Sequence, residues 1–315
     1  MYTNTAITRL VLLILVFILS VGRARAQNNS TKAGLAWPNG RYDDARQFTK
    51  TGKVSWYVYY TWSPSPVRGL DLEFVPMYWG ERQTEQFSES INDTIDAYDV
   101  KHILAFNEPQ QEGQADINVT RALELWTEYL LPLRDAYGVK LGSPAPTSAP
   151  DGMTWLHDFC DAIDEARGSD GCPEVDFIAL HWYDVDADNF KTYMEEFHDA
   201  FPGKSIWVTE WACQNFNSGA QCSYADIVTF MNATQSWMDE TDWIERYAWF
   251  GAMRDLQGVN ADNALLDKDG DLTDLGQQYI GEDPADPNND SSAQALFPVA
   301  LYTLAAAWLC QVAVA

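Results

Sequence analysis

Two glutamates at the ends of apolar, strand-like runs are the residues of this sequence best suited to chemistry. Glu108 closes the run 102–107, and Glu210 closes the run 205–209. A carboxylate at the end of a buried strand is costly to keep out of water unless it is used. Two such acids on two strands are the minimum set for cleaving a glycosidic bond, since one can attack while the other supplies a proton.

Eight apolar runs that read as strands alternate with stretches of helical periodicity. This alternation indicates an α/β fold with a parallel sheet, and eight units favour a single-domain (β/α)8 TIM barrel over residues 27–282. An open nucleotide-binding sheet would show G-x-G-x-x-G after its first strand, and the sequence has no such motif. The predicted strands are 33–37, 54–60, 72–78, 102–107, 139–143, 175–182, 205–211 and 246–250.

Two of the helical stretches have a clear apolar face. The first face is formed by positions 87, 91, 95 and 98, and the second by positions 123, 126, 130, 133 and 137. Gly138 directly after the second stretch indicates a helix C-cap. Pro132 lies inside the same stretch, so we expect a kink there.

In a barrel of this kind the reacting groups lie at the carboxyl ends of the strands. Glu108 ends the fourth strand and Glu210 the seventh, so the two acids can face each other across the barrel mouth. Retaining glycosidases hold such carboxyls about 5–5.5 Å apart, one ionised as nucleophile and one protonated as acid. The alternative is that Asn-Glu-Pro is only a turn tripeptide, and Glu112 in the next loop is a rival acid.

The residues around both acids resemble a known family. Asn-Glu-Pro at 107–109 and Thr-Glu-Trp at 209–211 resemble the clan of retaining (β/α)8 glycosidases. Leu-His-Trp-Tyr at 180–183, together with Trp-Val-Thr-Glu at 207–210, is similar to glycoside hydrolase family 128, which cleaves β-1,3-glucan and is common in fungi. The resemblance implies that Glu108 is the acid/base, that Glu210 is the nucleophile and that Asn107 hydrogen-bonds the sugar 2-hydroxyl.

Three further polar residues end predicted strands and are candidates for substrate binding. His181 and Tyr183 end the sixth strand, beside Glu210, and Ser143 ends the fifth. A tyrosine hydroxyl that donates to Glu210 would keep this carboxyl ionised and fix its rotamer. For His181 and Tyr183 the alternative is that they are buried groups satisfied by the backbone.

Tryptophan is abundant, with 13 residues, and several fall at or just past predicted strand ends. A sugar ring has an apolar face, so a tryptophan at the mouth of the barrel offers a broad stacking surface. Packing in the core is the alternative for each of them. The six candidates for the groove are Trp37, Trp62, Trp79, Trp182, Trp211 and Trp249.

The formal net charge of −26 excludes nucleic acid as a natural partner, because a strongly acidic surface repels phosphate. An acidic surface of this kind is compatible with a neutral sugar as substrate. The sequence has neither the H-E-x-x-H spacing of zinc proteases nor the G-x-S-x-G of serine hydrolases. We therefore expect no metal and no cofactor. We also expect the protein to be a monomer.

The amino-terminal segment predicts export. Arg9, an apolar run and the small-x-small pattern Ala24-Arg25-Ala26 are typical of a signal peptide over residues 1–26. An oxidising compartment favours two disulfides among four cysteines, and we expect the local pairs Cys160–Cys172 and Cys213–Cys222 rather than the two other pairings. Asn-x-Ser/Thr triplets predict glycosylated surface loops at positions 28, 29, 92, 118 and 232.

The carboxyl-terminal segment predicts a membrane attachment. Residues 293–315 are apolar and are followed by no Lys or Arg, and residues 283–292 form an acidic and polar stalk with small residues. This pattern favours a glycolipid (GPI) anchor signal, with an uncleaved membrane span as the rival.

Taken together, the residues predict a secreted, extracellular and surface-tethered retaining glycosidase that cleaves β-1,3-glucan internally and requires no cofactor. Two other functions stay open. One is a wall-glucan-binding protein that uses the barrel groove without turnover. The other is a glycosidase or transglycosylase for another β-glucan linkage.

Overall fold

Eight parallel strands occur in the part of the chain that the computed structural model describes, which is residues 30–39, 42–59, 66–283 and 285–288. Each overlaps one of the eight predicted runs, so the strand prediction is confirmed. The strands are β1 (Ala33–Ala36), β2 (Val54–Tyr59), β3 (Glu73–Pro76), β4 (His102–Ile103), β5 (Lys140–Leu141), β6 (Phe177–Asp184), β7 (Ser205–Cys213) and β8 (Ile244–Trp249).

Strand pairing returns to its starting point. Six strands pair in the order β3-β2-β1-β8-β7-β6, and β4 pairs with β5. Isolated bridges from Met77 to Leu104 and from Gly142 to Phe177 link these two groups. Pairing therefore runs from β1 through β8 and back to β1, the arrangement of the predicted (β/α)8 barrel.

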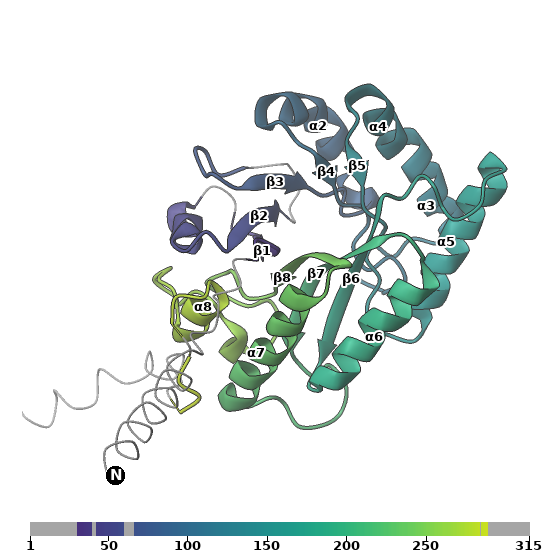
Figure 1. Cartoon of the computed structure of the whole chain (residues 1–315). Helices are drawn as coiled ribbons and strands as arrows, with labels where there is room; N and C mark the ends of the chain where they lie inside the picture. Colours follow the sequence, from purple (N-terminus) through teal and green to yellow (C-terminus); the bar gives the residue numbers. More distant parts are fainter. Residues whose placement is uncertain (1–29, 40–41, 60–65, 284, 289–315) are drawn as a thin grey trace, which may run out of the picture. The chain divides into compact units, whose positions relative to one another are not determined.

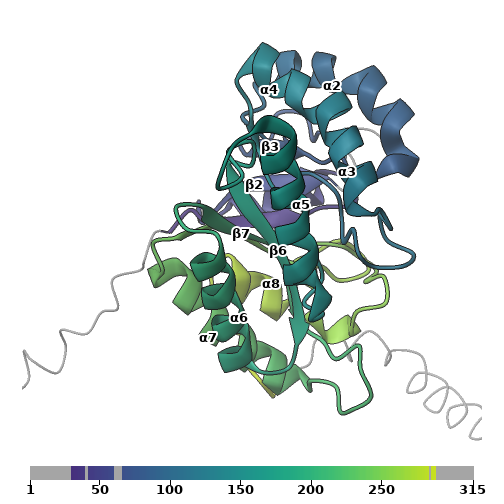
Figure 2. The same ribbon diagram turned by 90° about the vertical axis from the view of Figure 1, so that its right-hand side faces the viewer.

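Helices lie outside the strands, as Figures 1 and 2 show. No helix in the described ranges is long and apolar enough to cross a membrane. The α-helices are α2 (Thr84–Tyr98), α3 (Val119–Leu125), α4 (Leu131–Tyr137), α5 (Asp151–Arg167), α6 (Ala187–Ala200), α7 (Tyr224–Glu240) and α8 (Asp274–Tyr279).

The second predicted helix is divided at the expected place. A π-helix, Trp126–Leu130, separates α3 from α4, and Pro132 lies in the first turn of α4. Proline lacks the N–H that a continuous α-helix needs, so the wider π turn before it accommodates the missing bond. Gly138 ends α4 with a left-handed φ of 69°, as predicted for a C-cap.

The strands separate two hydrophobic clusters because successive side chains on a strand point to opposite faces. The larger cluster joins the outer faces of the strands to the helices. The smaller one fills the space inside the ring of strands. Its buried members are Ala36, Trp56, Val58, Val75, Met77, Leu104, Ala145, Phe177, Ala179, Trp207 and Ala248.

Both predicted disulfides are present, Cys160–Cys172 and Cys213–Cys222. Of the predicted glycosylation sites, positions 92, 118 and 232 are exposed, but they lie on α2, at the start of α3 and on α7 rather than in loops. The predicted signal peptide, positions 28 and 29 and the anchor signal lie outside the described residues.

Candidate active site

Glu108 is held by an unusual backbone just after β4. Its φ is 43°, in the left-handed region, and its N–H donates to the carbonyl of Ala145 at 2.8 Å. A residue other than glycine costs about 1–3 kcal/mol in such a conformation, so strain of this kind is typically found at functional sites. Glu108 is 8% exposed, with its side chain at the barrel mouth.

Glu210 is aimed inward by a β-bulge. Along the pair β6 and β7, Leu180 lies opposite Val208, while the next residue, His181, lies opposite Glu210. Thr209 is therefore an extra residue in β7. Trp207 points into the ring of strands, and without the bulge strict alternation would point Glu210 outward.

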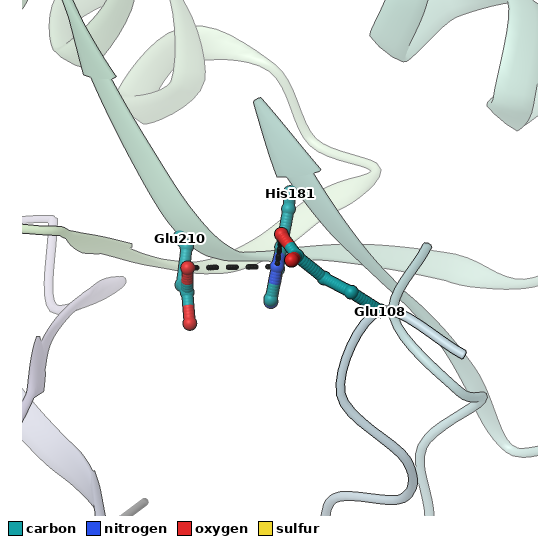
Figure 3. Close-up of side chains that lie close together, drawn as sticks. All are labelled: Glu108, His181 and Glu210. Atoms are coloured by element: carbon teal, nitrogen blue, oxygen red, sulfur yellow. Dashed lines mark hydrogen bonds and ion pairs between the residues drawn. The ribbon is translucent and has the colours of Figure 1, made fainter. Parts of the chain in front are cut away.

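The two glutamates meet at His181, as Figure 3 shows. His181 Nδ1 is 3.0 Å from Glu108 Oε1 and 3.5 Å from Glu210 Oε2. One oxygen of each carboxyl and this nitrogen all lie within 4.8 Å of one another. That separation fits the close pair of a retaining glycosidase better than the 6.5–9.5 Å pair of an inverting one.

His181 is fully buried, yet its pKa is raised. Burial by itself lowers the pKa of His181, but the charge of Glu210 and the hydrogen bond and charge of Glu108 outweigh it, so the pKa lies above the ordinary 6.5. Of the described side chains, Glu108, His181 and Glu210 are also close enough to hold a metal ion.

Tyr183 and Asn107 flank the two acids. The Tyr183 hydroxyl donates to Glu210 Oε2 at 2.6 Å, which favours the ionised carboxylate. Asn107 Nδ2 donates to Gln114 Oε1 at 3.1 Å. Both residues line the same cavity as Glu108 and Glu210, as the sequence predicted.

That cavity has a volume of about 890 Å³. Trp79 is the one predicted groove tryptophan among its described lining residues, and the Arg82 guanidinium lies 4.9 Å from the Trp79 ring centre. Arg82 also donates to the carbonyls of Gly113 and Gln114, which ties down the loop after Glu108. Polar side chains able to meet sugar hydroxyls complete the wall, including Gln83, Gln111, Glu112, Thr147, Ser148, Asn217 and Gln257.

Four predicted groove tryptophans are instead packed in the core. Trp211 follows Glu210, so it points the opposite way and donates to Thr234 of α7. Trp249 donates to the carbonyl of Asn263, Trp182 packs on the helix α6, and Trp37 packs on Phe48. Placing Trp37, Trp182, Trp211 and Trp249 in the groove was wrong, while Trp62 lies outside the described residues.

Two polar candidates also do not reach the cavity. His181 lies beneath the carboxyls and contacts them rather than open space. Ser143 is fully buried, its Oγ donating to the carbonyl of Pro144 and accepting from the N–H of Ala179, each at 2.9 Å. The prediction that these two side chains bind substrate was wrong, because both are buried and the Ser143 hydroxyl is hydrogen-bonded within the protein.

Two aromatic residues of the cavity wall were not predicted, Phe216 and Phe250. Phe250 has a signal in the sequence, because it follows Trp249 and the alternation of β8 turns it inward. Phe216 has none, since it lies in a loop without periodicity.

Comparison with known proteins gives two sequence matches. A family model described as glycosyl hydrolase catalytic core matches residues 34–279. Alkali-sensitive linkage protein 1 of Schizosaccharomyces pombe is 32% identical over 257 residues. The match covers 80% of this chain and 44% of that protein, so the chain spans less than half the length of this curated relative.

Two similar solved structures belong to glycoside hydrolase family 128. The subgroup V exo-β-1,3-glucanase of Cryptococcus neoformans is 31% identical with a TM-score of 0.65, and the match covers 79% of this chain and 98% of that one. The subgroup I endo-β-1,3-glucanase of Amycolatopsis mediterranei, in complex with laminaritriose, is 27% identical with a TM-score of 0.65, covering 81% and 100%.

Proposed function

Because the chain belongs to the glycosyl hydrolase catalytic core family, and within it to glycoside hydrolase family 128, we propose that it hydrolyses β-1,3-glucan with retention of configuration. The observation that carries this proposal is the close approach of Glu108 and Glu210 in one cavity, with His181 between them. A protein that only binds glucan has no use for two buried carboxyls held so close together.

The two acids divide the reaction between them. First, an oxygen of Glu210 bonds to the anomeric carbon while the bond from that carbon to the glycosidic oxygen breaks, and this oxygen takes a proton from Glu108. Then Glu108 removes a proton from water, whose oxygen attacks the same carbon and releases Glu210. His181 lies within hydrogen-bond or ion-pair range of both carboxyls and can position them for these steps.

Replacing the nucleophile tests the proposal. Glu210→Gln should abolish the release of new reducing ends from laminari-oligosaccharides, because the amide keeps the shape of the side chain and cannot attack. Binding of the same sugars, measured by calorimetry, should persist. A wild type that binds these sugars without releasing reducing ends would favour the rival function of a glucan-binding protein.

Replacing the acid/base should have a different effect. Glu108→Gln removes the proton donor, so turnover of oligosaccharides should fall by about 10²–10⁴-fold, while an aryl glucoside with an acidic leaving group keeps part of its first step. Added azide should then yield a β-glucosyl azide. Detection of the α anomer as the first wild-type product by NMR would mean inversion and would refute the assignment of Glu210.

Internal cleavage stays a prediction, because the similar structures include an exo-acting and an endo-acting enzyme. Sizing the products of linkage-defined oligosaccharides separates the two modes, and also separates hydrolysis from transfer to a second sugar. Early release of mixed oligomers is the expected result, whereas glucose alone would mean exo action.

We also propose that the protein is exported and tethered by a glycolipid. The two disulfides support an oxidising compartment. A phospholipase that cuts glycolipid anchors should release the protein from membranes. Retention of an intact carboxyl-terminal peptide in the membrane fraction would favour an uncleaved span instead.

A further inference from the structure

An exposed aromatic side chain borders the two acids. Phe216 lies in the loop between β7 and α7, is 60% exposed and lines the cavity. Its ring meets Tyr183 edge-on, with 5.2 Å between centres, and Tyr183 donates to Glu210. A single exposed apolar side chain needs no explanation on an open surface, but this one has a cavity beside it.

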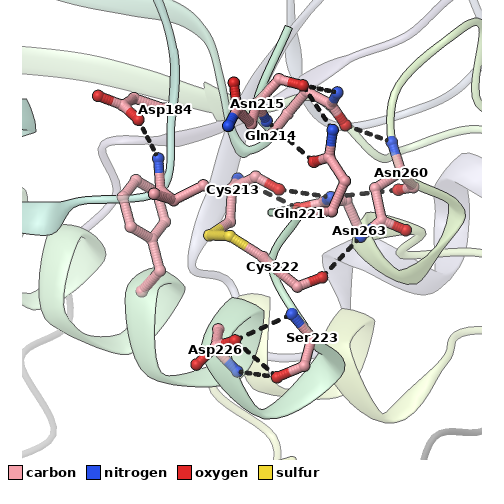
Figure 4. The surroundings of a disulfide bond; sticks show 12 residues. Asp184, Cys213, Gln214, Asn215, Gln221, Cys222, Ser223, Asp226, Asn260 and Asn263 are labelled. Atoms are coloured by element: carbon pink, nitrogen blue, oxygen red, sulfur yellow. Dashed lines mark hydrogen bonds between the residues drawn. A yellow bond between two sulfur atoms is a disulfide. The ribbon is translucent and has the colours of Figure 1, made fainter. Parts of the chain in front are cut away.

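The loop that carries Phe216 is held in one conformation. The disulfide Cys213–Cys222 closes its base, as Figure 4 shows. Across the loop, the Asn215 N–H donates to Gln221 Oε1 at 2.9 Å, and Gln221 Nε2 donates back to the Asn215 carbonyl at 2.5 Å. Both backbone groups of Asn215, the residue just before Phe216, are therefore held by the side-chain amide of Gln221.

The base of the loop is also tied to the segment after β8. Asn263 exchanges two hydrogen bonds with the backbone of Cys213, at 3.2 and 3.1 Å. Asn260 donates from its side chain to the Cys222 carbonyl and from its backbone to Gln214 Oε1. A loop fixed in this way loses little further freedom when a ligand binds, which increases affinity.

We propose that Phe216 is a stacking platform for a glucose unit next to the one that reacts. The Phe216 ring contacts Tyr183, and the Tyr183 hydroxyl donates to Glu210, so the ring lies one side chain away from the proposed nucleophile. The apolar face of a pyranose fits the exposed ring, and neighbouring polar residues of the cavity, such as Asn217, can meet its hydroxyls. This inference rests on the proposed glucan substrate.

The test measures laminarihexaose binding by calorimetry in a Glu210→Gln parent. Adding Phe216→Ala should raise the dissociation constant about tenfold, because the stacking face is lost. Phe216→Trp should restore affinity. Tyr137→Ala is the matched control, since Tyr137 is an exposed aromatic on α4 outside the cavity lining, and it should leave affinity unchanged.

Equal affinity of the Phe216→Ala variant and its parent would overturn the inference. Weak binding by both the alanine and the tryptophan variants, with a lowered melting temperature, would also overturn it, since the ring would then only pack the loop. A parent that binds no laminarihexaose would refute the proposed function and this inference together.

Discussion

The His181 side chain contacts both acids of the site. Two carboxyls whose oxygens lie within 4.8 Å in a buried site repel each other when both are ionised, and an imidazole that gains a proton beside them offsets that repulsion. The histidine hydrogen-bonds Glu108 and lies in ion-pair range of Glu210, so it holds both side chains in place. Its contribution is to position the two carboxyls, because the imidazole itself is buried and does not line the cavity.

Removing this histidine should change how stability depends on pH. The folded pKa of His181 is raised, so its contribution is complete below the unfolded value near 6.5 and is lost as pH rises through the higher folded pKa. His181→Asn should therefore destabilise the protein most at pH 5.5 and least at pH 9, measured by urea unfolding. A difference that does not vary with pH would contradict a charged His181.

Ser143 should matter for stability and not for catalysis. Ser143→Ala leaves the buried N–H of Ala179 without its acceptor, which should cost about 1–3 kcal/mol of unfolding free energy. The kcat on laminari-oligosaccharides should not change, and exposed Ser88→Ala on α2 is the control for both measurements. A lower kcat with unchanged stability would instead place Ser143 in contact with sugar.

At the scale of the element, one extra residue in β7 determines which side chains of this strand face the cavity. The bulge at Thr209 turns Glu210 toward the cavity and leaves Trp211 outward, where it packs against α7. The same strand leads directly into the loop that presents Phe216. One strand and its loop thus supply both an acid and an aromatic wall.

The two disulfides should differ in their effect on binding. Replacing Cys213 and Cys222 with serine should cost about 2–3 kcal/mol and also weaken laminarihexaose binding, because the Phe216 loop loses its closed base. Replacing Cys160 and Cys172, whose loop ends outside the cavity, should cost a similar amount of stability without changing affinity. Equal effects of both pairs on affinity would refute a specific role of the loop.

At the scale of the whole molecule, a partly buried cluster of charged side chains lies at the end of the barrel opposite the acids. Glu73, at the start of β3, accepts from His102 at 2.6 Å and from Arg246 at 2.5 Å. The Arg246 guanidinium lies 4.3 Å from the ring centre of Trp207 inside the barrel. Groups at the amino ends of barrel strands usually serve stability rather than catalysis.

This cluster should make stability depend on pH in the acid range. Burial raises the pKa of Glu73, but His102 and Arg246 outweigh it and hold the pKa below 4.5. Its contribution is thus present above pH 4.5 and lost as pH falls through the lower folded value. Glu73→Gln should be less stable than wild type at pH 7 and nearly equal at pH 2, by thermal unfolding, while Lys101→Ala, at an exposed site, should change neither.

The sequence by itself determined the order of the elements and the position of the two acids at strand ends. Eight apolar runs separated by helical stretches leave few arrangements other than a barrel, and local cysteine spacing indicated the disulfides. Glu108, Glu210, Tyr183 and Trp79 were identified because strand ends meet at one mouth, and Asn107 was identified through the family resemblance.

Only the tertiary structure decided which way side chains point. A bulge such as the one at Thr209 reverses the direction of every later side chain in its strand, and apolar composition carries no mark of it. Trp211 therefore points away from the cavity, while Trp37, Trp182 and Trp249 pack on elements outside the ring of strands. Ser143 holds two strands together. Phe216 lies in the cavity wall because its loop is hydrogen-bonded to Asn260 and Asn263, which are far away in the sequence. Contacts of that range leave no periodic signal in the sequence.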